Sequence, residues 1–190
     1  MKLSRDFYTR DNVVEIAKDL IGKFLMTNIS GIISGGMIIE TEAYAGITDK
    51  ASHAYGGRRT NRTEVMYAEG GISYVYLCYG IHHLFNVVTN IAGVPHAVLI
   101  RGIEPIVGLS DILNRTNKKI VKGIADGPGK LTKALGIDLN FNKIDLCSDK
   151  IWIEDRGINL TDSEIKISPR IGIDYAEEDA FLPYRFNIIT

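Results

Sequence analysis

Apolar positions at the start of the chain change from helical to strand spacing. Through residues 11–21 they recur at helical intervals and Gly22 follows as a stop, which predicts a helix. The next two apolar runs predict strands over 24–28 and 32–44, the second interrupted at Gly35-Gly36. Residues 45–70 follow neither spacing, so we expect a long ordered loop, which in a compact domain is more often functional than idle.

The middle of the chain contains three apolar runs separated by turn residues. They predict an antiparallel meander over 72–78, 84–90 and 96–103. Tyr79-Gly80 should lie near the first tip of this meander and Ala92-Gly93 near the second.

Helices and short strands are predicted for the remainder. One helix should follow Pro105 and end near Asn114, and another should run from Gly127 to Gly136. Strands are predicted over 151–153, 165–167, 171–173 and 185–188. Strands outnumber helices, so the predicted class is α+β: one domain over 1–190 with a curved, largely antiparallel sheet, flanking helices and a protruding β-hairpin.

Composition narrows the functional classes. The 190 residues are 45% hydrophobic and 24% charged, with a net charge of −1, which argues against strong non-specific nucleic-acid binding but allows a local basic surface. Cys78 and Cys147 lie far apart without a CxxC or Cys/His cluster, so we expect neither a zinc site nor a disulfide scaffold. The N-terminus lacks the apolar core of a signal peptide, and no apolar run reaches the ~20 residues that span a bilayer. We therefore expect a cytoplasmic protein.

The segment Glu40-Thr41-Glu42-Ala43-Tyr44 carries the strongest chemical signal, because acids end an otherwise apolar strand. With a period of two, Glu40, Glu42 and Tyr44 share one face. A carboxylate near apolar and aromatic walls can act as a general base with a shifted pKa. Spacing alone leaves Glu42 either such a base or a solvent-facing strand residue, and for Glu40 it favours a supporting or structural role.

Tyrosines suggest a binding site for a flat ligand. Tyr74 and Tyr76 share a strand face, and with Tyr44 they could form an aromatic wall that sandwiches a base. The alternative is ordinary cross-strand packing. Tyr79 at a hairpin tip could be a wedge between stacked base pairs, or could fold back onto the body.

Basic residues and histidines have weaker signals. Arg58, Arg59 and Arg62 follow His53 in the long loop, and Lys130 follows Gly127-Pro128-Gly129. If the fold gathers them, they form a phosphate-binding surface, and the alternative is a solvated surface. His53 alone could be a structural hydrogen-bonding residue.

Together these motifs resemble, in order, the alkyladenine (methylpurine, 3-methyladenine) DNA glycosylase family. The matching segments cover nearly the whole chain: 40–44, His53, 56–58, 74–80, Asn86, 101–105, 127–131, 169–172 and 184–186. One departure is Thr60-Asn61-Arg62-Thr63, where the family usually has Thr-x-Arg-Asn.

The resemblance implies a single-domain, monofunctional enzyme that flips a damaged purine out of duplex DNA and hydrolyses its glycosidic bond. Glu42 would activate the attacking water and Arg101 would lie beside that water. Around the base, Tyr44 would stack on one face, and Tyr76 and His53 would enclose the other side and the edge. Asn86 would exclude guanine, and Tyr79 would fill the gap in the stack.

The same resemblance sets expectations about partners. We expect double-stranded DNA with alkylated or deaminated purines as the substrate: 3-methyladenine, 7-methylguanine, hypoxanthine or ethenoadenine, which the sequence does not rank. We expect a monomer with no cofactor, no metal and no membrane contact, acting at the nucleoid in a prokaryote or in the nucleus in a eukaryote. A non-catalytic nucleic-acid-binding module and a small-molecule hydrolase or acyl transferase are the alternative classes.

Overall fold

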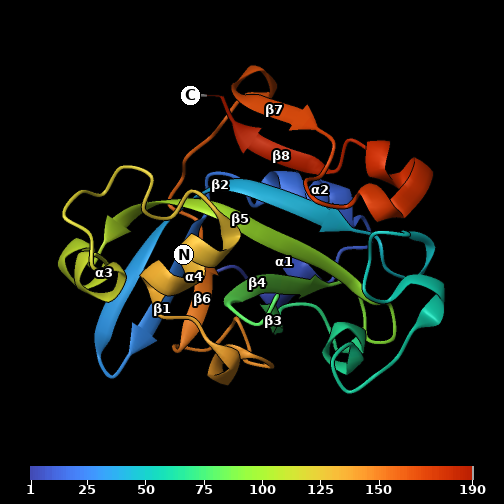
Figure 1. Cartoon of the computed structure of the whole chain (residues 1–190), viewed down its shortest axis with the longest axis horizontal. Coiled ribbons are helices and arrows are strands. Elements are labelled where there is room, and N and C mark those ends of the chain that lie inside the picture. The colour runs from blue at the N-terminus through green and yellow to red at the C-terminus, as the bar shows by residue number, and fades with distance from the viewer. Residues whose placement is uncertain (190) are drawn as a thin grey trace.

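A branched antiparallel sheet organises the molecule (Figure 1). The computed structural model describes residues 1–189, and within them eight strands form one sheet whose main path runs β3-β4-β5-β2-β1-β6, with β8 pairing both β2 and β7. The strands are β1 (Phe24–Ile29), β2 (Ile32–Tyr44), β3 (Ser73–Cys78), β4 (His82–Thr89), β5 (His96–Val107), β6 (Ile151–Glu154), β7 (Ile165–Ser168) and β8 (Arg185–Ile188). The predicted α+β class and largely antiparallel sheet are confirmed.

The meander β3-β4-β5 forms as predicted. β3 and β4 are joined by a three-residue turn in which Ile81 N–H donates to Cys78 O at 3.1 Å. Tyr79 (φ 50°) and Gly80 (φ 72°) both lie in the left-handed region. A bulky residue rarely adopts this conformation, and here it leaves the Tyr79 side chain 92% exposed at the hairpin tip.

β2 is the strand where the sheet branches. Its first part pairs with β1, whereas Glu40, Thr41 and Glu42 pair with β8 on one side. β5 runs along the other side of β2, with register shifts at Gly35/Gly36, Ile38/Glu40 and Glu40/Thr41. The interruption predicted at Gly35-Gly36 is therefore a local irregularity in a continuous strand, and two further irregularities flank Glu40.

Helices cover the sheet. The longer ones are α2 (Val13–Asp19), α3 (Leu109–Thr116) and α4 (Pro128–Leu135), and a single turn, α1 (Arg5–Tyr8), precedes them. Asn12 caps α2 by accepting from Val14 N–H and Glu15 N–H. α2 packs against β2 and β5, and α4 packs against β4 and β5. The apolar faces of both helices join the main core cluster, through Ile16 and Ala17 from α2 and Leu131 and Leu135 from α4.

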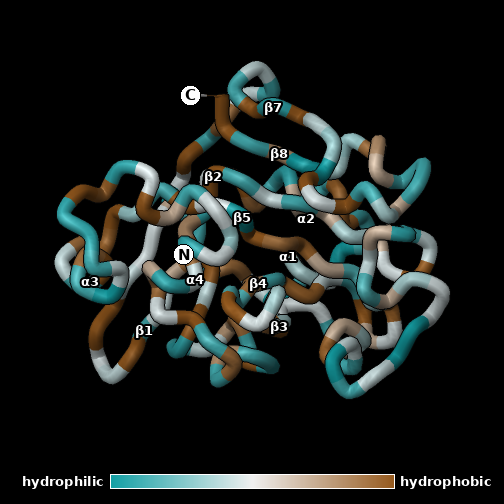
Figure 2. Tube along the Cα trace, in the orientation of Figure 1, coloured by the Kyte–Doolittle hydropathy of each residue, from teal (hydrophilic) through white to brown (hydrophobic). Residues whose placement is uncertain are grey.

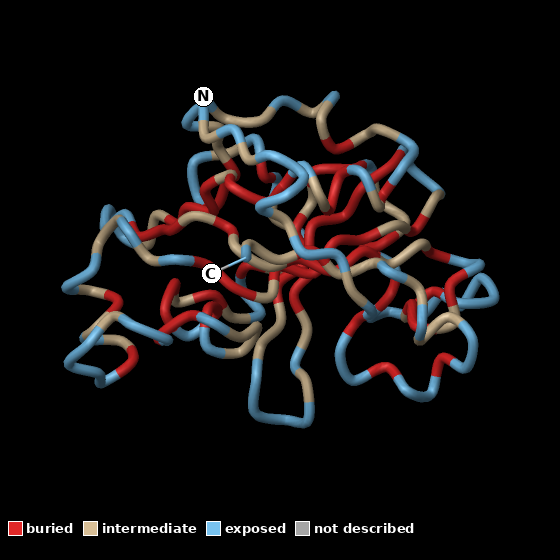
Figure 3. The backbone as a smooth tube through the Cα atoms, turned by 90° about the horizontal axis from the view of Figure 1, so that it is seen from above, coloured by how far each residue is buried: buried red, intermediate tan, exposed pale blue. Residues whose placement is uncertain are grey.

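Hydropathy and burial follow the same arrangement. Apolar stretches concentrate in the strands (Figure 2), and buried residues occupy the centre of the molecule while exposed loops surround it (Figure 3). Residues 45–70 are an ordered loop that contains three short 3₁₀ turns: Gly46–Thr48, Tyr55–Gly57 and Glu64–Tyr67. In the described part of the chain, no helix is long and apolar enough to cross a membrane.

Two predicted elements differ from the structure. Pro105 does not start a helix, because β5 continues through it to Val107 and α3 begins only at Leu109. The predicted strand at 171–173 is wrong: this segment is irregular, with Gly172 at φ 74°. The two isoleucines do not share a buried strand face, since Ile173 is buried while Ile171 is 49% exposed.

Candidate active site

The carboxylate of Glu42 is fully buried at the branch point of the sheet. Its side chain has no accessible surface, and three donors approach it. Tyr44 Oη–H donates to Oε2 at 2.8 Å, and Arg101 Nη1 lies 3.4 Å from the same oxygen. Ile171 N–H donates to Oε1 at 2.8 Å. Glu42 and Tyr44 therefore lie on the same side of β2, as the period of two predicts.

Burial dominates the acid–base properties of this pair. Loss of solvation raises the pKa of Glu42, and Arg101, the Ile171 N–H and the Tyr44 hydroxyl oppose that rise. Burial, together with the neighbouring Glu42 carboxylate, raises the pKa of Tyr44 well above its usual value. The Tyr44 hydroxyl thus stays protonated at neutral pH and acts as the donor. The carboxylate keeps three stabilising contacts and a raised pKa, a combination that suits a general base.

Glu40, two residues before Glu42 on β2, has a different set of contacts. Its Oε1 accepts from Arg101 Nε at 2.9 Å and from Arg185 Nε at 2.6 Å. Glu40 thereby links β5 to β8 across β2, and it orients the guanidinium that also approaches Glu42. These two bonds agree with the supporting or structural role expected for Glu40.

A cavity of about 740 Å³ opens directly in front of this buried cluster. Both Tyr44 and Ile171, which donate to Glu42, line it. The remaining wall comes from the 45–70 loop, from β3 and β4 and from the start of α4, and it includes His53, Arg62, Tyr74, Tyr76, Asn86, Gly127, Pro128, Gly129 and Lys130. The four predicted base-binding residues, Tyr44, His53, Tyr76 and Asn86, thus line one cavity, with Glu42 just behind its wall.

Aromatic rings and a neutral histidine line one part of the cavity. The Tyr74 and Tyr76 ring centroids are 5.3 Å apart, and the His53 ring meets Tyr76 edge-on at 4.8 Å. His53 Nδ1 lies 2.9 Å from Tyr74 Oη, and Arg62 Nη2 lies 3.3 Å from His53 Nε2. Burial, assisted by Arg62 and Arg58, lowers the pKa of His53 to about 4, so the ring is neutral at physiological pH.

The contacts of His53 also define its tautomer. Arg62 has only donors to offer, so Nε2 must be the accepting nitrogen and Nδ1 carries the proton. Nδ1–H then donates to Tyr74 Oη, which also accepts from Arg62 Nε at 3.3 Å. The Arg62 guanidinium stacks on Tyr76, with Cζ 4.6 Å from the ring centroid.

Asn86 is held on the wall by the main chain. It is 4% exposed, and Nδ2–H donates to Tyr74 O at 3.1 Å across the β3–β4 ladder. This bond fixes the amide plane next to the aromatic rings.

The four basic residues proposed to bind the DNA backbone have different surroundings. Arg62 is part of the cavity lining. Arg59 is exposed and forms two hydrogen bonds with the Glu64 carboxylate, each 2.7 Å long. Lys130 pairs with Asp126 at 2.8 Å but keeps 62% of its side chain exposed at the cavity rim. Arg58 is exposed, and among residues 1–189 it has no ion pair.

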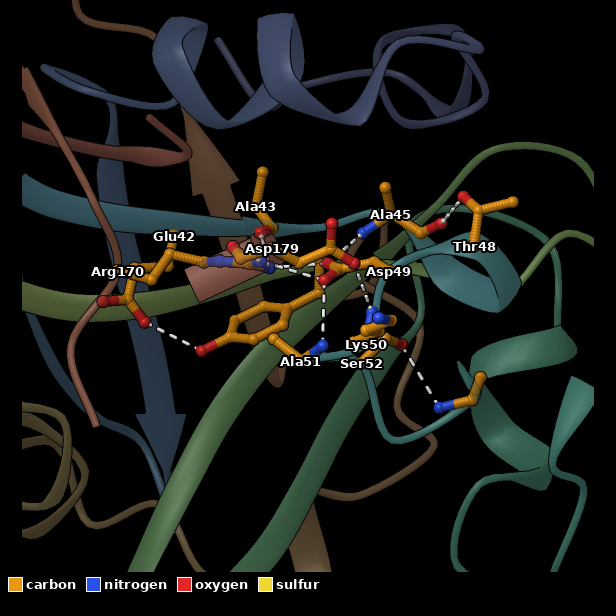
Figure 4. A network of polar contacts seen from close by, with 12 residues as sticks. Glu42, Ala43, Ala45, Thr48, Asp49, Lys50, Ala51, Ser52, Arg170 and Asp179 are labelled. Carbon is orange, nitrogen blue, oxygen red and sulfur yellow. Dashed lines mark hydrogen bonds and ion pairs between the residues drawn. The ribbon is translucent and has the colours of Figure 1, made fainter. Parts of the chain in front are cut away.

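Sequence reasoning did not single out one buried pair beside Tyr44. Arg170 and Asp49 are 0% and 1% exposed, and they form a two-pronged ion pair with bonds of 2.5 and 2.8 Å (Figure 4). The signal that could have revealed Arg170 is the segment Pro169-Arg170-Ile171-Gly172, where a lone cation interrupts apolar residues. Asp49 has no comparable signal.

Comparison with known proteins shows the family of this chain. A sequence model of methylpurine-DNA glycosylases matches residues 6–190. A protein of Clostridium perfringens (strain 13 / Type A) is 47% identical over 197 aligned positions, which cover 99% of this chain and 96% of that protein. Proteins of Desulfitobacterium hafniense (strain Y51) and Chlamydia felis (strain Fe/C-56) are 45% and 47% identical, covering 98% and 97% of this chain and 95% and 94% of their own. All three are provisionally named 3-methyladenine DNA glycosylases.

The site and these matches define a DNA glycosylase, an enzyme that removes a base from DNA. The chain belongs to the methylpurine-DNA glycosylase family, which confirms the family that its motifs resemble.

Proposed function

We propose that this enzyme releases alkylated purines, 3-methyladenine and 7-methylguanine first among them, from duplex DNA by direct hydrolysis and leaves an abasic site. The observation that supports this most is the position of Glu42: a desolvated carboxylate directly behind the wall of an aromatic cavity. The proposal has three parts, which concern the base that activates water, the recognition of the purine and the distortion of the duplex.

Glu42 is the proposed general base. A carboxylate offers about four acceptor positions, and the contacts of Glu42 use two on Oε2 and one on Oε1. The remaining position on Oε1 can accept a proton from a water aligned with C1′ of the flipped nucleotide once the side chains that cover the carboxylate in the free protein make room for that water. Water adds its oxygen to C1′, the bond from C1′ to the purine nitrogen breaks, and the electron pair leaves with the purine while Glu42 takes the proton. Arg101, 3.4 Å from Oε2, stabilises the ionised base before the reaction.

The aromatic cavity is the proposed recognition element. A purine alkylated at N3 or N7 carries a positive charge, which makes it a good leaving group and attracts it to electron-rich rings. Tyr44 would stack on one face, Tyr76 on the other, and His53 would contact the edge. Because His53 is neutral, it does not repel a cationic base. Asn86 would exclude guanine by a clash with its exocyclic amine.

Tyr79 is the proposed wedge. It is 92% exposed at the tip of the β3–β4 hairpin and also belongs to the cavity lining. A ring at this point can occupy the space that a flipped nucleotide leaves in the stack. Lys130 and Arg58, both exposed, are the proposed phosphate contacts.

Substitution of Glu42 by Gln tests the proposal. The amide cannot accept the water's proton, and general-base catalysis contributes about 10²- to 10⁴-fold. Single-turnover release of 3-methyladenine from alkylated duplex should fall by that factor, with duplex affinity retained. The matched control is Glu104→Gln, an exposed glutamate on β5, which should behave like the unaltered enzyme. Retained release in Glu42→Gln would falsify the role of the base.

The same assay separates the alternative classes. A nucleic-acid-binding module would bind alkylated duplex without releasing free base, and a small-molecule hydrolase would show no preference for damaged DNA. A panel of duplexes with 3-methyladenine, 7-methylguanine, hypoxanthine or ethenoadenine then ranks the substrates. Hypoxanthine and ethenoadenine are neutral, so faster release of the two charged bases would support recognition by the aromatic cavity.

A further inference from the structure

We propose that Arg170, clamped by Asp49, is a positioning residue that holds the stacking ring of Tyr44 and the carboxylate of Glu42 in their working geometry. This inference deepens the proposed function and rests on it. It assigns to one buried ion pair the orientation of both the base-stacking group and the general base.

The Arg170–Asp49 pair is more tightly bonded than most ion pairs of this molecule. The two Nη–H groups of Arg170 donate to both carboxylate oxygens, and they also donate to Ala43 O at 2.9 Å and Asp179 O at 3.2 Å. Asp49 in turn accepts from Ala45 N–H at 2.9 Å and from Ala51 N–H at 3.0 Å. The pair thereby ties three segments together: the end of β2, the loop after it and the chain before β8 (Figure 4).

Arg170 contacts the stacking tyrosine from behind. Its guanidinium carbon lies 4.8 Å from the centroid of the Tyr44 ring and 5.3 Å from that of Tyr184. Tyr44 lines the cavity, whereas Arg170 is 0% exposed. The guanidinium therefore supports the ring from the side away from the cavity and leaves the cavity side for a ligand.

The backbone next to Arg170 contacts the general base. Ile171 N–H donates to Glu42 Oε1 at 2.8 Å, and the bond from Arg170 to Ala43 O falls on the residue between Glu42 and Tyr44. Tyr44 Oη–H in turn donates to Glu42 Oε2, so Arg170, Tyr44 and Glu42 are connected through one set of contacts. A displacement of the Arg170 side chain would therefore move the Ile171 amide, the Tyr44 ring and the carboxylate together.

A purely structural role explains this arrangement less well. A buried ion pair is a weak source of stability, because desolvation offsets most of the attraction between the charges. Hydrophobic residues of similar volume could fill the same space at equal or lower cost. What they could not supply is a planar donor that at once bonds a carboxylate, bonds the β2 main chain and stacks on Tyr44.

The test is Arg170→Lys, with Arg115→Lys as the matched control. Lysine keeps the charge but loses the planar fork and the stacking surface. Arg115 is a half-buried arginine with two bonds to the body of the protein, to Ala134 O and Ser34 Oγ, and it lies outside the cavity lining. Both variants are compared at temperatures where circular dichroism shows them equally folded.

Two measurements are made on each variant. The first is single-turnover base release as a function of pH. The second is the titration of the Glu42 carboxyl in the free protein by ¹³C NMR, which needs no DNA; the other groups facing Glu42, namely Arg101, Glu40 and Tyr44, are unchanged in it. Arg170→Lys should slow release by about 10- to 100-fold, as misplacement of about 1 Å does in an active site. The Glu42 titration should also move to higher pH, because the Ile171 N–H bond weakens.

The outcomes are distinct. If Arg170→Lys matches Arg115→Lys in release and in the Glu42 titration, and differs only in thermal stability, the positioning role is overturned. If the unaltered enzyme releases no base but Arg170→Lys still moves the Glu42 titration, the proposed function fails and the positioning of Glu42 stands. If Arg170→Lys does not fold, Asp49→Asn serves instead: it keeps Arg170, weakens the clamp and should move both measurements in the same direction.

Discussion

Replacement of Tyr44 by Phe isolates one hydrogen bond in the active site. The change removes Oη, which donates to Glu42 Oε2 at 2.8 Å, and keeps the ring that is proposed to stack on the base. The bond stabilises the ionised form of Glu42, so its loss raises the pKa of a carboxyl whose pKa burial has already raised. A general base works only when it is ionised, so the acid limb of the pH–rate profile should move to higher pH.

The structure sets the size of the effect. A hydrogen bond to a charged group contributes about 1.5–3 kcal/mol, and because about 1.4 kcal/mol is tenfold in an equilibrium, the ionised fraction falls about 10- to 150-fold on the acid side of the limb. Glu42 is fully buried, so solvent does not replace the lost donor. Arg101 and the Ile171 N–H still stabilise the ionised carboxylate, so the fall in the ionised fraction should be toward the lower end of that range. Above the limb the rate should change little, because Glu42 is ionised in both proteins.

The assay is single-turnover release from a duplex with one 7-methylguanine, followed from acidic to mildly alkaline pH. Tyr8→Phe is the control: Tyr8 is fully buried, and within residues 1–189 its hydroxyl has no hydrogen-bond partner, so its removal should leave the profile unchanged. A limb that stays in place in Tyr44→Phe, or a rate that falls equally at all pH values, would refute the argument that Tyr44 tunes Glu42.

Three further substitutions test the cavity and its rim. Arg62→Gln should raise the pKa of His53 from about 4, although burial, the larger cause, will keep it below its usual value; an NMR titration of the imidazole that shows no change would contradict this. Asn86→Ala should increase release of unmodified guanine at least about tenfold relative to 7-methylguanine, since a clash of this kind commonly supplies that much discrimination, and unchanged selectivity would remove its proposed role. Tyr79→Ala should weaken binding to an abasic-site duplex by about 5- to 150-fold, the value of about 1–3 kcal/mol of stacking; unaltered affinity in an electrophoretic shift assay would exclude the wedge.

Local sequence patterns predicted the elements that carry the site. The strand over 32–44 has the predicted bounds, because its apolar run continues to the acids and ends at Tyr44. The meander and its exposed tip at Tyr79 follow from apolar runs separated by turn residues. These features depend on neighbours within a few positions, which is the range over which periodicity carries information.

Long-range pairing was beyond the reach of those patterns. Glu40 meets Arg185 across 145 positions, and Arg170 meets Asp49 across 121. No periodicity links residues so far apart, so Glu40 stayed ambiguous and Asp49 went unnoticed. The incorrect strand at 171–173 has the same origin: alternating isoleucines imitate a strand, whereas Ile171 N–H donates to Glu42 and Gly172 is left-handed.

Charge balance behind the cavity bears on how a cationic base is recognised. Glu40 and Glu42 are matched by Arg101 and Arg185, and Asp49 is matched by Arg170, so this buried cluster has no formal net charge. A neutral cluster cannot attract a charged purine over a distance. Attraction must then come from short-range contact with the ring faces, which falls off quickly and favours a base that is already flipped. On this reasoning the proposed enzyme would discriminate between bases after extrusion, and hydrolysis would add a second preference, because a positively charged purine is also the better leaving group.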